Sequence, residues 1–244
     1  MAPAAHCSRE FRLLQQTETL PTARYPIPAT ILDLANWSLQ LPVKDAMIVK
    51  QPQLNFFNSS IFYGMVVLVT PAGGDTTSGS QYPRTELREM KNAGRDEASW
   101  GTSDGTRHVM NFSGAPNRLP RAEPGVTIAQ VKSSRSEPME LRVLDEGKGP
   151  TVVVRFNDTA KDKTTLDSAY RLGSFYSITI TVEKGSIAVA YANGAKAANT
   201  SRKASAAGCY SKVGNYLQSD NRDDIANKEW AEVVIRSLRV THSK

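Results

Sequence analysis

Residues 82–90 read YPRTELREM, and two arginines and two glutamates crowd into a segment that otherwise has the character of a β-strand. Alternate side chains of a strand lie on the same face of a sheet. Arg84, Glu86 and Arg88 therefore project together, whereas Leu87 projects to the opposite face and is available for a hydrophobic core. The segment predicts a strand with a charged face backed by an apolar one.

Two further segments have the same design. In TIAQVKSS (127–134), Gln130 and Lys132 share one face and Val131 takes the other. The segment CYSKVGNYLQS (209–219) follows the same rule if no β-bulge interrupts it. One of its faces then carries Tyr210, Lys212, Gly214, Tyr216 and Gln218. If the three strands are neighbours, this face forms a groove that suits an acidic, hydroxyl-rich polymer. Cations bind carboxylates, amides bind hydroxyls, and tyrosine rings stack on sugars.

Strand signals dominate the rest of the chain. Short runs rich in β-branched and aromatic residues alternate with turn-forming segments such as Pro71–Asp75, Glu183–Ser186 and Asn193-Gly194. The further predicted strands are 61–70, 108–112, 127–132, 140–144, 151–156, 176–183, 187–192 and 230–241. Helix signals are confined to short stretches at 31–37 and 223–233. The pattern predicts an all-β fold, a jelly-roll sandwich of two antiparallel sheets with a concave substrate groove.

The domain organisation follows from an even composition. No linker-like segment divides the 244 residues. A chain of this length is normal for one all-β domain. We therefore expect an N-terminal arm at 1–29 and a single jelly-roll domain at 30–244.

The charge balance points to an anionic partner. The formal net charge is +6 and the isoelectric point is about 9.3, and a basic protein attracts polyanions. The basic residues are scattered, and no helix-turn-helix, zinc-finger or RNA-binding motif accompanies them. No apolar run approaches the roughly 18 residues that span a membrane. We expect a monomer that binds an acidic polysaccharide, and neither a nucleic acid nor a membrane.

Sequons and cysteines indicate the compartment. The N-x-[ST] sequons of a secreted glycoprotein occur at Asn36, Asn58, Asn111, Asn157 and Asn199. Cys7 and Cys209 belong to no metal or redox motif, and they form either one disulfide or two separate thiols. The first residues, MAPAAHCSREF, lack the apolar segment of a signal peptide. We expect an extracellular protein whose signal peptide is not present in this chain.

Three motifs carry a family resemblance. They are RTELR at 84–88, QVK at 130–132 and YSKVGNYLQ at 210–218. They resemble R-[ST]-E-L-R, Q-[IV]-H and Y-F-K-x-G-x-Y-x-Q of polysaccharide lyase family 7, the alginate lyases. Ser211 stands where the family has phenylalanine, and Lys132 stands where it has histidine. The resemblance extends over residues 30–242.

The resemblance implies a β-jelly roll and a lyase that cleaves polyuronates by β-elimination without a metal or other cofactor. By analogy, Arg84 and Gln130 neutralise the uronate carboxylate, so that negative charge can move onto it as the weakly acidic C5 proton leaves. Tyr216 serves as the base that removes this proton, as the acid that protonates the departing O4, or as both. The substrate-binding residues that we expect beside them are Glu86, Arg88, Tyr210, Lys212, Asn215, Gln218 and His108.

Lys132 leaves one catalytic role open. Like charge and desolvation beside Arg84 can release its proton, so that Lys132 acts as the base. It can instead stay charged and help to neutralise the carboxylate. It can also mark a protein that binds the polymer without cleaving it. We count Lys132 among the expected catalytic residues with Arg84, Gln130 and Tyr216.

Several functions compete for this surface. The first interpretation is a lyase that acts on an alginate-like polymer. The alternatives are a glucuronan lyase of the same fold and a non-catalytic polyuronate-binding module. The presence of both Arg84 and Tyr216 favours catalysis, because binding alone does not need this pair. A jelly-roll glycoside hydrolase would need closely spaced carboxylates such as E-x-D-x-x-E, which the sequence lacks.

Overall fold

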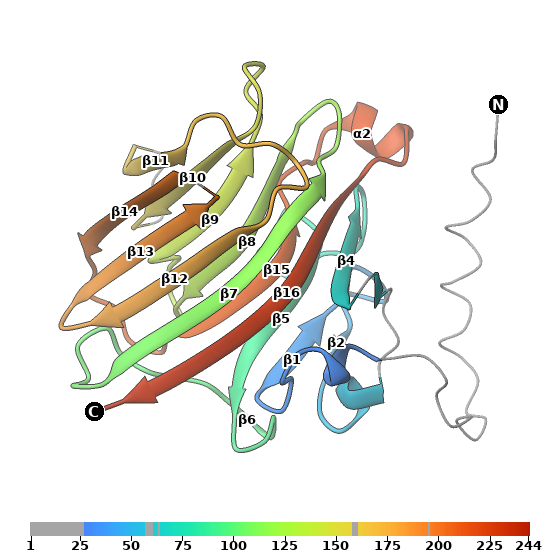
Figure 1. The fold of residues 1–244 in the computed structure, drawn as a ribbon. Helices are drawn as coiled ribbons and strands as arrows, with labels where there is room; N and C mark the ends of the chain where they lie inside the picture. The colour runs from blue at the N-terminus through green and yellow to red at the C-terminus, as the bar shows by residue number, and fades with distance from the viewer. Residues whose placement is uncertain (1–26, 57–60, 63, 158–160, 195) are drawn as a thin grey trace.

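Two antiparallel β-sheets lie face to face in the structure (Figure 1). The part of the chain that this computed structural model describes comprises residues 27–56, 61–62, 64–157, 161–194 and 196–244. The all-β jelly-roll sandwich expected from the sequence is confirmed. The boundary between arm and domain at residue 30 stays a prediction, because residues 1–26 lie outside the described part.

The nine-stranded sheet holds the three motif strands β8, β15 and β5 side by side. Its order in space is β11 (Lys163–Asp167), β10 (Thr151–Phe156), β9 (Met139–Leu144), β8 (Gly125–Lys132), β15 (Tyr210–Leu217), β5 (Arg84–Lys91), β1 (Trp37–Gln40) and β2 (Ile48–Val49), with β6 (Asp96–Glu97) paired to β5. Neighbouring strands are antiparallel. The three polar faces therefore form one surface.

The seven-stranded sheet packs against the opposite, apolar face of these strands. Its order is β14 (Lys196–Lys203), β13 (Ser186–Asn193), β12 (Tyr176–Glu183), β7 (Arg107–Arg118), β16 (Trp230–Ser243), β4 (Met65–Pro71) and β3 (Ile61–Phe62). Alternation builds the core between the sheets: in β12, Ile178, Ile180 and Val182 are buried, whereas Thr179 and Thr181 face outward. Burying each branched side chain contributes about 1.5–3 kcal/mol.

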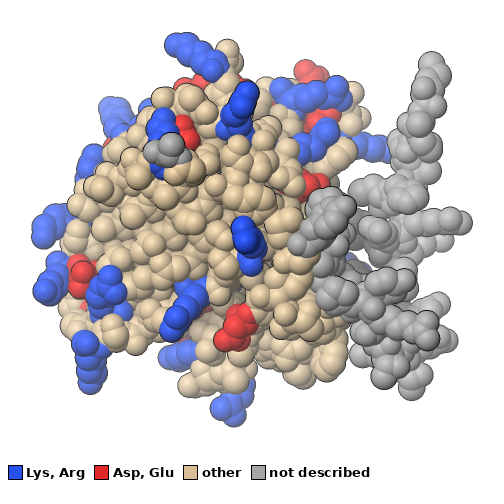
Figure 2. All heavy atoms as spheres, in the orientation of Figure 1, with Lys and Arg blue, Asp and Glu red and all other residues tan. Residues whose placement is uncertain are grey.

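The outer face of the seven-stranded sheet carries small, uncharged side chains. Thr179, Thr181, Ala188, Ala190 and Ser201 line a shallow depression there. This sheet lies in front in the views of Figures 1 and 2, and Figure 2 shows Lys and Arg side chains standing apart across that side of the molecule. This face therefore offers no continuous basic patch. No helix among the described residues is long and apolar enough to cross a membrane.

Outside the sheets, the described residues contain one short α-helix, α2 (Arg222–Ala226), on the predicted stretch 223–233. They also contain the 3-10 turns η2 (Pro28–Thr30) and η3 (Gln53–Phe56). The stretch 31–37 forms no α-helix and leads into β1 instead.

The predicted strand at 61–70 is in fact a hairpin. Its two strands, β3 and β4, pair through Ile61 and Val66. Gly64, at the turn between them, has φ of +73°, a conformation that favours glycine. The β-branched residues of this run predicted a strand correctly, but the single glycine divides it.

Cys209 is a free thiol with no exposed surface. It lies beside Trp100, with which it exchanges two backbone hydrogen bonds. Burial raises the pKa of the Cys209 thiol to about 11, so it stays protonated at neutral pH. Cys7 lies outside the described residues.

A bulge in β15 positions Tyr216. The pairing of β15 with β8 shifts between Val213 and Tyr216, whereas its pairing with β5 is continuous. Gly214 has φ of +151°, and a Cβ atom added to it would lie 2.7 Å from the Thr85 carbonyl oxygen and 2.9 Å from the Glu86 Cα atom. Only glycine allows β15 to approach β5 this closely.

We expect Gly214→Ala to lower the free energy of unfolding by about 1–3 kcal/mol, because the new methyl group collides with the backbone of β5. The melting temperature would fall by roughly 2–4 °C for each kcal/mol. Gly147→Ala is the matched control: Gly147 has φ of +87° but open space around the added Cβ atom. Calorimetric melting of both variants checks the prediction, and an equal loss in the two would contradict the packing argument.

Candidate active site

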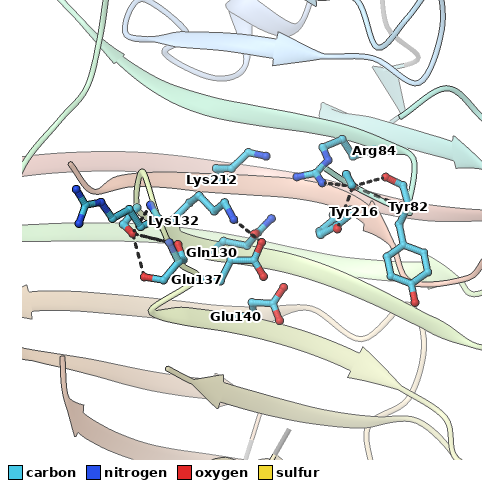
Figure 3. A network of polar contacts seen from close by, with 12 residues as sticks. Tyr82, Arg84, Gln130, Lys132, Glu137, Glu140, Lys212 and Tyr216 are labelled. Carbon is cyan, nitrogen blue, oxygen red and sulfur yellow. Dashed lines mark hydrogen bonds and ion pairs between the residues drawn. The ribbon is translucent and has the colours of Figure 1, made fainter. Parts of the chain in front are cut away.

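Five side chains from β5, β8 and β15 lie on one face of the nine-stranded sheet, and we call them the polar floor: Arg84, Glu86, Gln130, Lys212 and Tyr216. Figure 3 labels all of them except Glu86. The register places Tyr216 beside Arg84, and Lys212 beside Gln130. None of the five residues is more than 7% exposed. The polar face predicted from alternation is therefore recessed below the surface.

Glu86 lies at the centre of the polar floor and is fully buried. Lys212 Nζ contacts its Oε2 as an ion pair, and Arg84 Nη1 lies 3.4 Å from the same oxygen. Gln130 Nε2 donates to Oε1 at 2.6 Å. A buried charge without such partners would cost several kcal/mol. Glu86 therefore holds Arg84, Gln130 and Lys212 in place.

Lys212 is a buried lysine with a perturbed pKa. Desolvation lowers its pKa to about 8, although the Glu86 carboxylate opposes this shift. An unperturbed lysine titrates at about 10.4. Lys212 is thus charged at neutral pH and loses its proton in mildly alkaline solution.

Tyr216 is enclosed by Arg84 and Ser80. The Arg84 guanidinium lies over the Tyr216 ring, 3.6 Å from its centroid. Ser80 Oγ lies 3.3 Å from the Tyr216 hydroxyl and accepts a hydrogen bond from Arg84 Nη2 at 2.8 Å. A guanidinium in this position stabilises negative charge that develops on the tyrosine oxygen. Sequence reasoning missed Ser80, because one serine in a loop carries no signal.

Lys132 ends β8 and pairs with Tyr210 rather than with Tyr216. Its Nζ atom lies 2.6 Å from Oε1 of Glu137, in the loop that leads to β9. The two side chains are 30% and 22% exposed. The structure thus gives Lys132 a carboxylate partner that the sequence analysis missed, since Glu137 lies outside the predicted strands.

Arg88 and Tyr210 lie on the same face, toward the other end of their strands from Tyr216. The Arg88 guanidinium lies 4.0 Å from the Tyr210 ring centroid. Its Nη2 atom lies 3.0 Å from Oε2 of Glu97 on β6. These two predicted substrate-binding residues extend the polar surface beyond the floor.

Glu140 adds a further carboxylate that sequence reasoning missed. It lies on β9 beside Gln130 and is 4% exposed. Its Oε2 atom accepts from Arg142 Nε at 3.0 Å, whereas Oε1 has no partner among the described residues. Burial raises the pKa of Glu140, although Arg142 opposes the shift. Glu140 and Arg142 are two residues apart, as are the charged residues of β5. This spacing in the sequence is the signal that would have predicted a charged face on β9.

Asn215, a predicted substrate-binding residue, does not lie on the polar floor. Its amide donates to the carbonyl oxygens of Leu68 at 2.9 Å and Ala231 at 2.8 Å, both in the facing sheet. Odd and even positions of a strand face opposite ways, so Asn215 faces inward when Tyr216 faces the floor. Gln218 follows the end of β15, and its amide donates to the carbonyl oxygens of the last two residues of that strand.

His108, also a predicted substrate-binding residue, lies away from the polar floor, because β7 belongs to the seven-stranded sheet. His108 Nδ1 lies 2.7 Å from His242 Nδ1, and its Nε2 atom lies 3.1 Å from Asp104 Oδ1. His242 Nε2 in turn lies 2.8 Å from Glu89 Oε1, and this hydrogen bond raises the pKa of His242. Glu89 projects from the inner face of β5, so this chain of side chains joins the two sheets.

Comparison with known proteins identifies the fold and its motifs. A family model described as alginate lyase matches residues 32–242. The chain belongs to the alginate lyase family. The structure is similar to the alginate lyase AlgAT5 from polysaccharide lyase family 7, with 35% identity and a TM-score of 0.80 over 90% of this chain and 100% of that one. It is also similar to the alginate lyase from Corynebacterium sp., with 30% identity and a TM-score of 0.77 over 89% and 98% of the two chains.

A third solved structure, the alginate lyase A1-II' of polysaccharide lyase family 7, shares 25% identity, with a TM-score of 0.73 over 90% of this chain and 100% of that one. No curated protein sequence matches. The family assignment confirms the resemblance seen in the three motifs, and it makes this alginate lyase family member a polysaccharide lyase.

The pKa of Lys212 gives this alginate lyase family member a testable pH dependence. In the unfolded chain the residue regains a pKa near 10.4. Between pH 8 and 10 the unfolded state therefore binds more protons than the folded state, and the contribution of Lys212 to the free energy of unfolding rises with pH. The Lys212→Met variant has no titrating group at position 212, so its free energy of unfolding lacks this rise with pH.

Urea unfolding at pH 7 and pH 9.5 checks this expectation. From pH 7 to pH 9.5, the unfolding free energy of wild type should rise by about 2 kcal/mol relative to that of Lys212→Met. Lys196→Met, at a half-exposed lysine paired with Asp167, serves as the control. A difference that does not change with pH would show that Lys212 titrates normally.

Proposed function

We propose that this protein cleaves an alginate-like polyuronate by β-elimination, with Tyr216 transferring the protons. One observation carries the proposal. Tyr216 lies between a guanidinium and a hydroxyl, and both are held by the buried network around Glu86. A binding surface needs cations and stacking rings, but it does not need a recessed phenol with a cation over its ring. The arrangement supports catalysis over a non-catalytic binding module.

The chemistry assigns a role to each part of the polar floor. The C5 proton of a uronate is weakly acidic, and it becomes removable when the adjacent carboxylate is neutralised. Arg84 and Lys212 supply positive charge at that position, and Gln130 supplies an amide. Tyr216 removes the C5 proton and protonates the departing O4. No step in this scheme uses a metal or another cofactor.

Unpaired buried atoms support a ligand on this face. Arg84 Nε, Gln130 Oε1 and Glu140 Oε1 have no hydrogen-bond partner among the described residues. Buried polar atoms are nearly always paired in folded proteins. These three atoms on one face can pair with the hydroxyl and carboxylate groups of a sugar acid. Arg88, Tyr210 and Gln218 stay proposed substrate-binding residues along the same surface.

Relatives support the substrate class. One structure of the family 7 lyase A1-II', with a tyrosine replaced, is described as a complex with the product GGG. Another, with a histidine and a tyrosine replaced, is described as a complex with the substrate GGMG. By this similarity alginate is the first substrate to test, and glucuronan is the alternative of the same chemistry. We further propose a secreted monomer that acts on the polysaccharide outside the cell.

We expect Tyr216→Phe to lower turnover by about 10²–10⁴-fold, because the change removes the proton-transferring hydroxyl. The affinity for the polymer should change little, since the charged groups of the floor remain. Initial rates follow from the ultraviolet absorbance of the new C4=C5 double bond, and affinity follows from binding titrations with alginate and glucuronan.

Tyr170→Phe is the matched control. It also removes one buried hydroxyl, which donates to the Ser174 carbonyl oxygen at 2.6 Å, away from the polar floor. Its turnover should match that of wild type. A Tyr216→Phe enzyme as active as wild type would remove Tyr216 from the mechanism.

A further inference from the structure

Lys132 and Glu137 form an ion pair beside the polar floor, with 2.6 Å between Nζ and Oε1. The carboxylate therefore occupies the terminal nitrogen of Lys132. A neutral histidine, by contrast, offers a nitrogen that can accept a proton. Where the family motif has a histidine, this chain thus has a side chain whose nitrogen is already engaged by a carboxylate.

The loop after β8 fixes Glu137 in this position. Ser133 Oγ accepts hydrogen bonds from the backbone N–H groups of Ser136 at 2.9 Å and Arg135 at 3.2 Å. The Ser133 N–H donates to the Ser136 carbonyl oxygen at 2.9 Å. Glu137 follows this closed turn directly, and Pro138 restricts the backbone after it. The ion pair is therefore part of the folded architecture.

The other titratable side chains on this face do not supply a second base. Glu86 is enclosed by its three donors, and the buried Lys212 nitrogen is occupied by its ion pair with Glu86. The Glu140 carboxylate is held by an arginine on the same strand. Burial and nearby carboxylates raise the pKa of Tyr82, whose ring packs edge-on against Tyr216. We therefore assign proton transfer on this face to Tyr216, whose hydroxyl lies beside Arg84 and Ser80.

A single residue can perform the elimination only from one side of the sugar ring. The Tyr216 phenolate takes the proton from C5, and the C5–H electron pair becomes the C4=C5 double bond. The C4–O4 bond breaks with its electron pair on O4, and the tyrosine hydroxyl returns the proton to O4. The phenolate is regenerated and no other reactant is consumed.

This geometry requires H5 and O4 on the same side of the ring. They lie on the same side in β-D-mannuronate and β-D-glucuronate. In α-L-guluronate, the C5 epimer of mannuronate, they lie on opposite sides, and elimination needs a base and an acid on opposite sides of the ring.

We propose that the Lys132–Glu137 ion pair makes this enzyme selective for mannuronate or glucuronate polymers and poor on polyguluronate. The inference rests on the proposed β-elimination by Tyr216 and adds which uronates the site accepts. Mannuronate and glucuronate share their configuration at C4 and C5 and differ at C2. The side chain at position 132 does not distinguish mannuronate from glucuronate, so polymers of both are included in the test.

The test compares kcat/KM on polymannuronate, glucuronan and polyguluronate of equal length. Wild type should act on at least one of the first two polymers about 10²-fold or more faster than on polyguluronate, since a missing general base costs about this much. Lys132→His should raise kcat/KM on polyguluronate at least about 10-fold by returning a proton acceptor. Lys132→Arg keeps the positive charge but cannot release a proton near neutral pH, so the selectivity ratio should stay as in wild type.

Lys196→His is the matched control, because Lys196 is also ion-paired, to Asp167 at 2.9 Å, but belongs to the other sheet. It should change no rate. Wild type that cleaves polyguluronate as fast as the other polymers would overturn the inference. So would a Lys132→His enzyme that folds, as judged by its melting curve, but gains no polyguluronate activity. Inactivity of wild type on all three polymers would instead overturn the proposed function.

Discussion

A fully buried carboxylate must be matched by donors, and this requirement at Glu86 organises the site. Its partners Lys212, Gln130 and Arg84 come from all three motif strands. A one-residue slip of any strand would turn its partner to the opposite face. The side-chain network and the backbone ladders therefore specify the same register. Tyr216 depends on both, because the guanidinium over its ring is itself held by Glu86 and Ser80.

Strand periodicity explains how much of the site is predictable from the sequence. Arg84, Gln130 and Tyr216 share a face because side chains alternate, and this rule needs no tertiary information. Asn215 lies within a motif, and its place in the continuous pairing of β15 with β5 turns it toward the other sheet. His108 lies away from the floor for another reason: alternation within a strand does not say which sheet the strand joins.

Loop residues mark the limit of that reasoning. Ser80 and Glu137 contact motif residues from segments without periodicity, so only the folded chain brings them to Arg84 and Lys132. The fold class was predictable because many short alternating runs and turn signals agree with one another. The edge strand β14 was not predicted, because its sequence KAANTSRK has no apolar alternation. A polar edge strand of this kind protects a sheet from pairing with other chains.

The centre of the site face carries an excess of positive charge. Around it, three cations each contact a carboxylate: Lys132 contacts Glu137, Arg88 contacts Glu97 and Arg142 contacts Glu140. At the centre, two cations, from Arg84 and Lys212, share the Glu86 carboxylate. These three central side chains carry one more positive than negative charge, in a recessed site where electrostatic interactions are stronger than in water. In the proposed mechanism, a single uronate carboxylate completes the balance there, beside Tyr216 and the guanidinium over its ring. Under the proposed mechanism, the same charges that stabilise Glu86 in the folded protein thus select the sugar ring that the polymer presents to Tyr216.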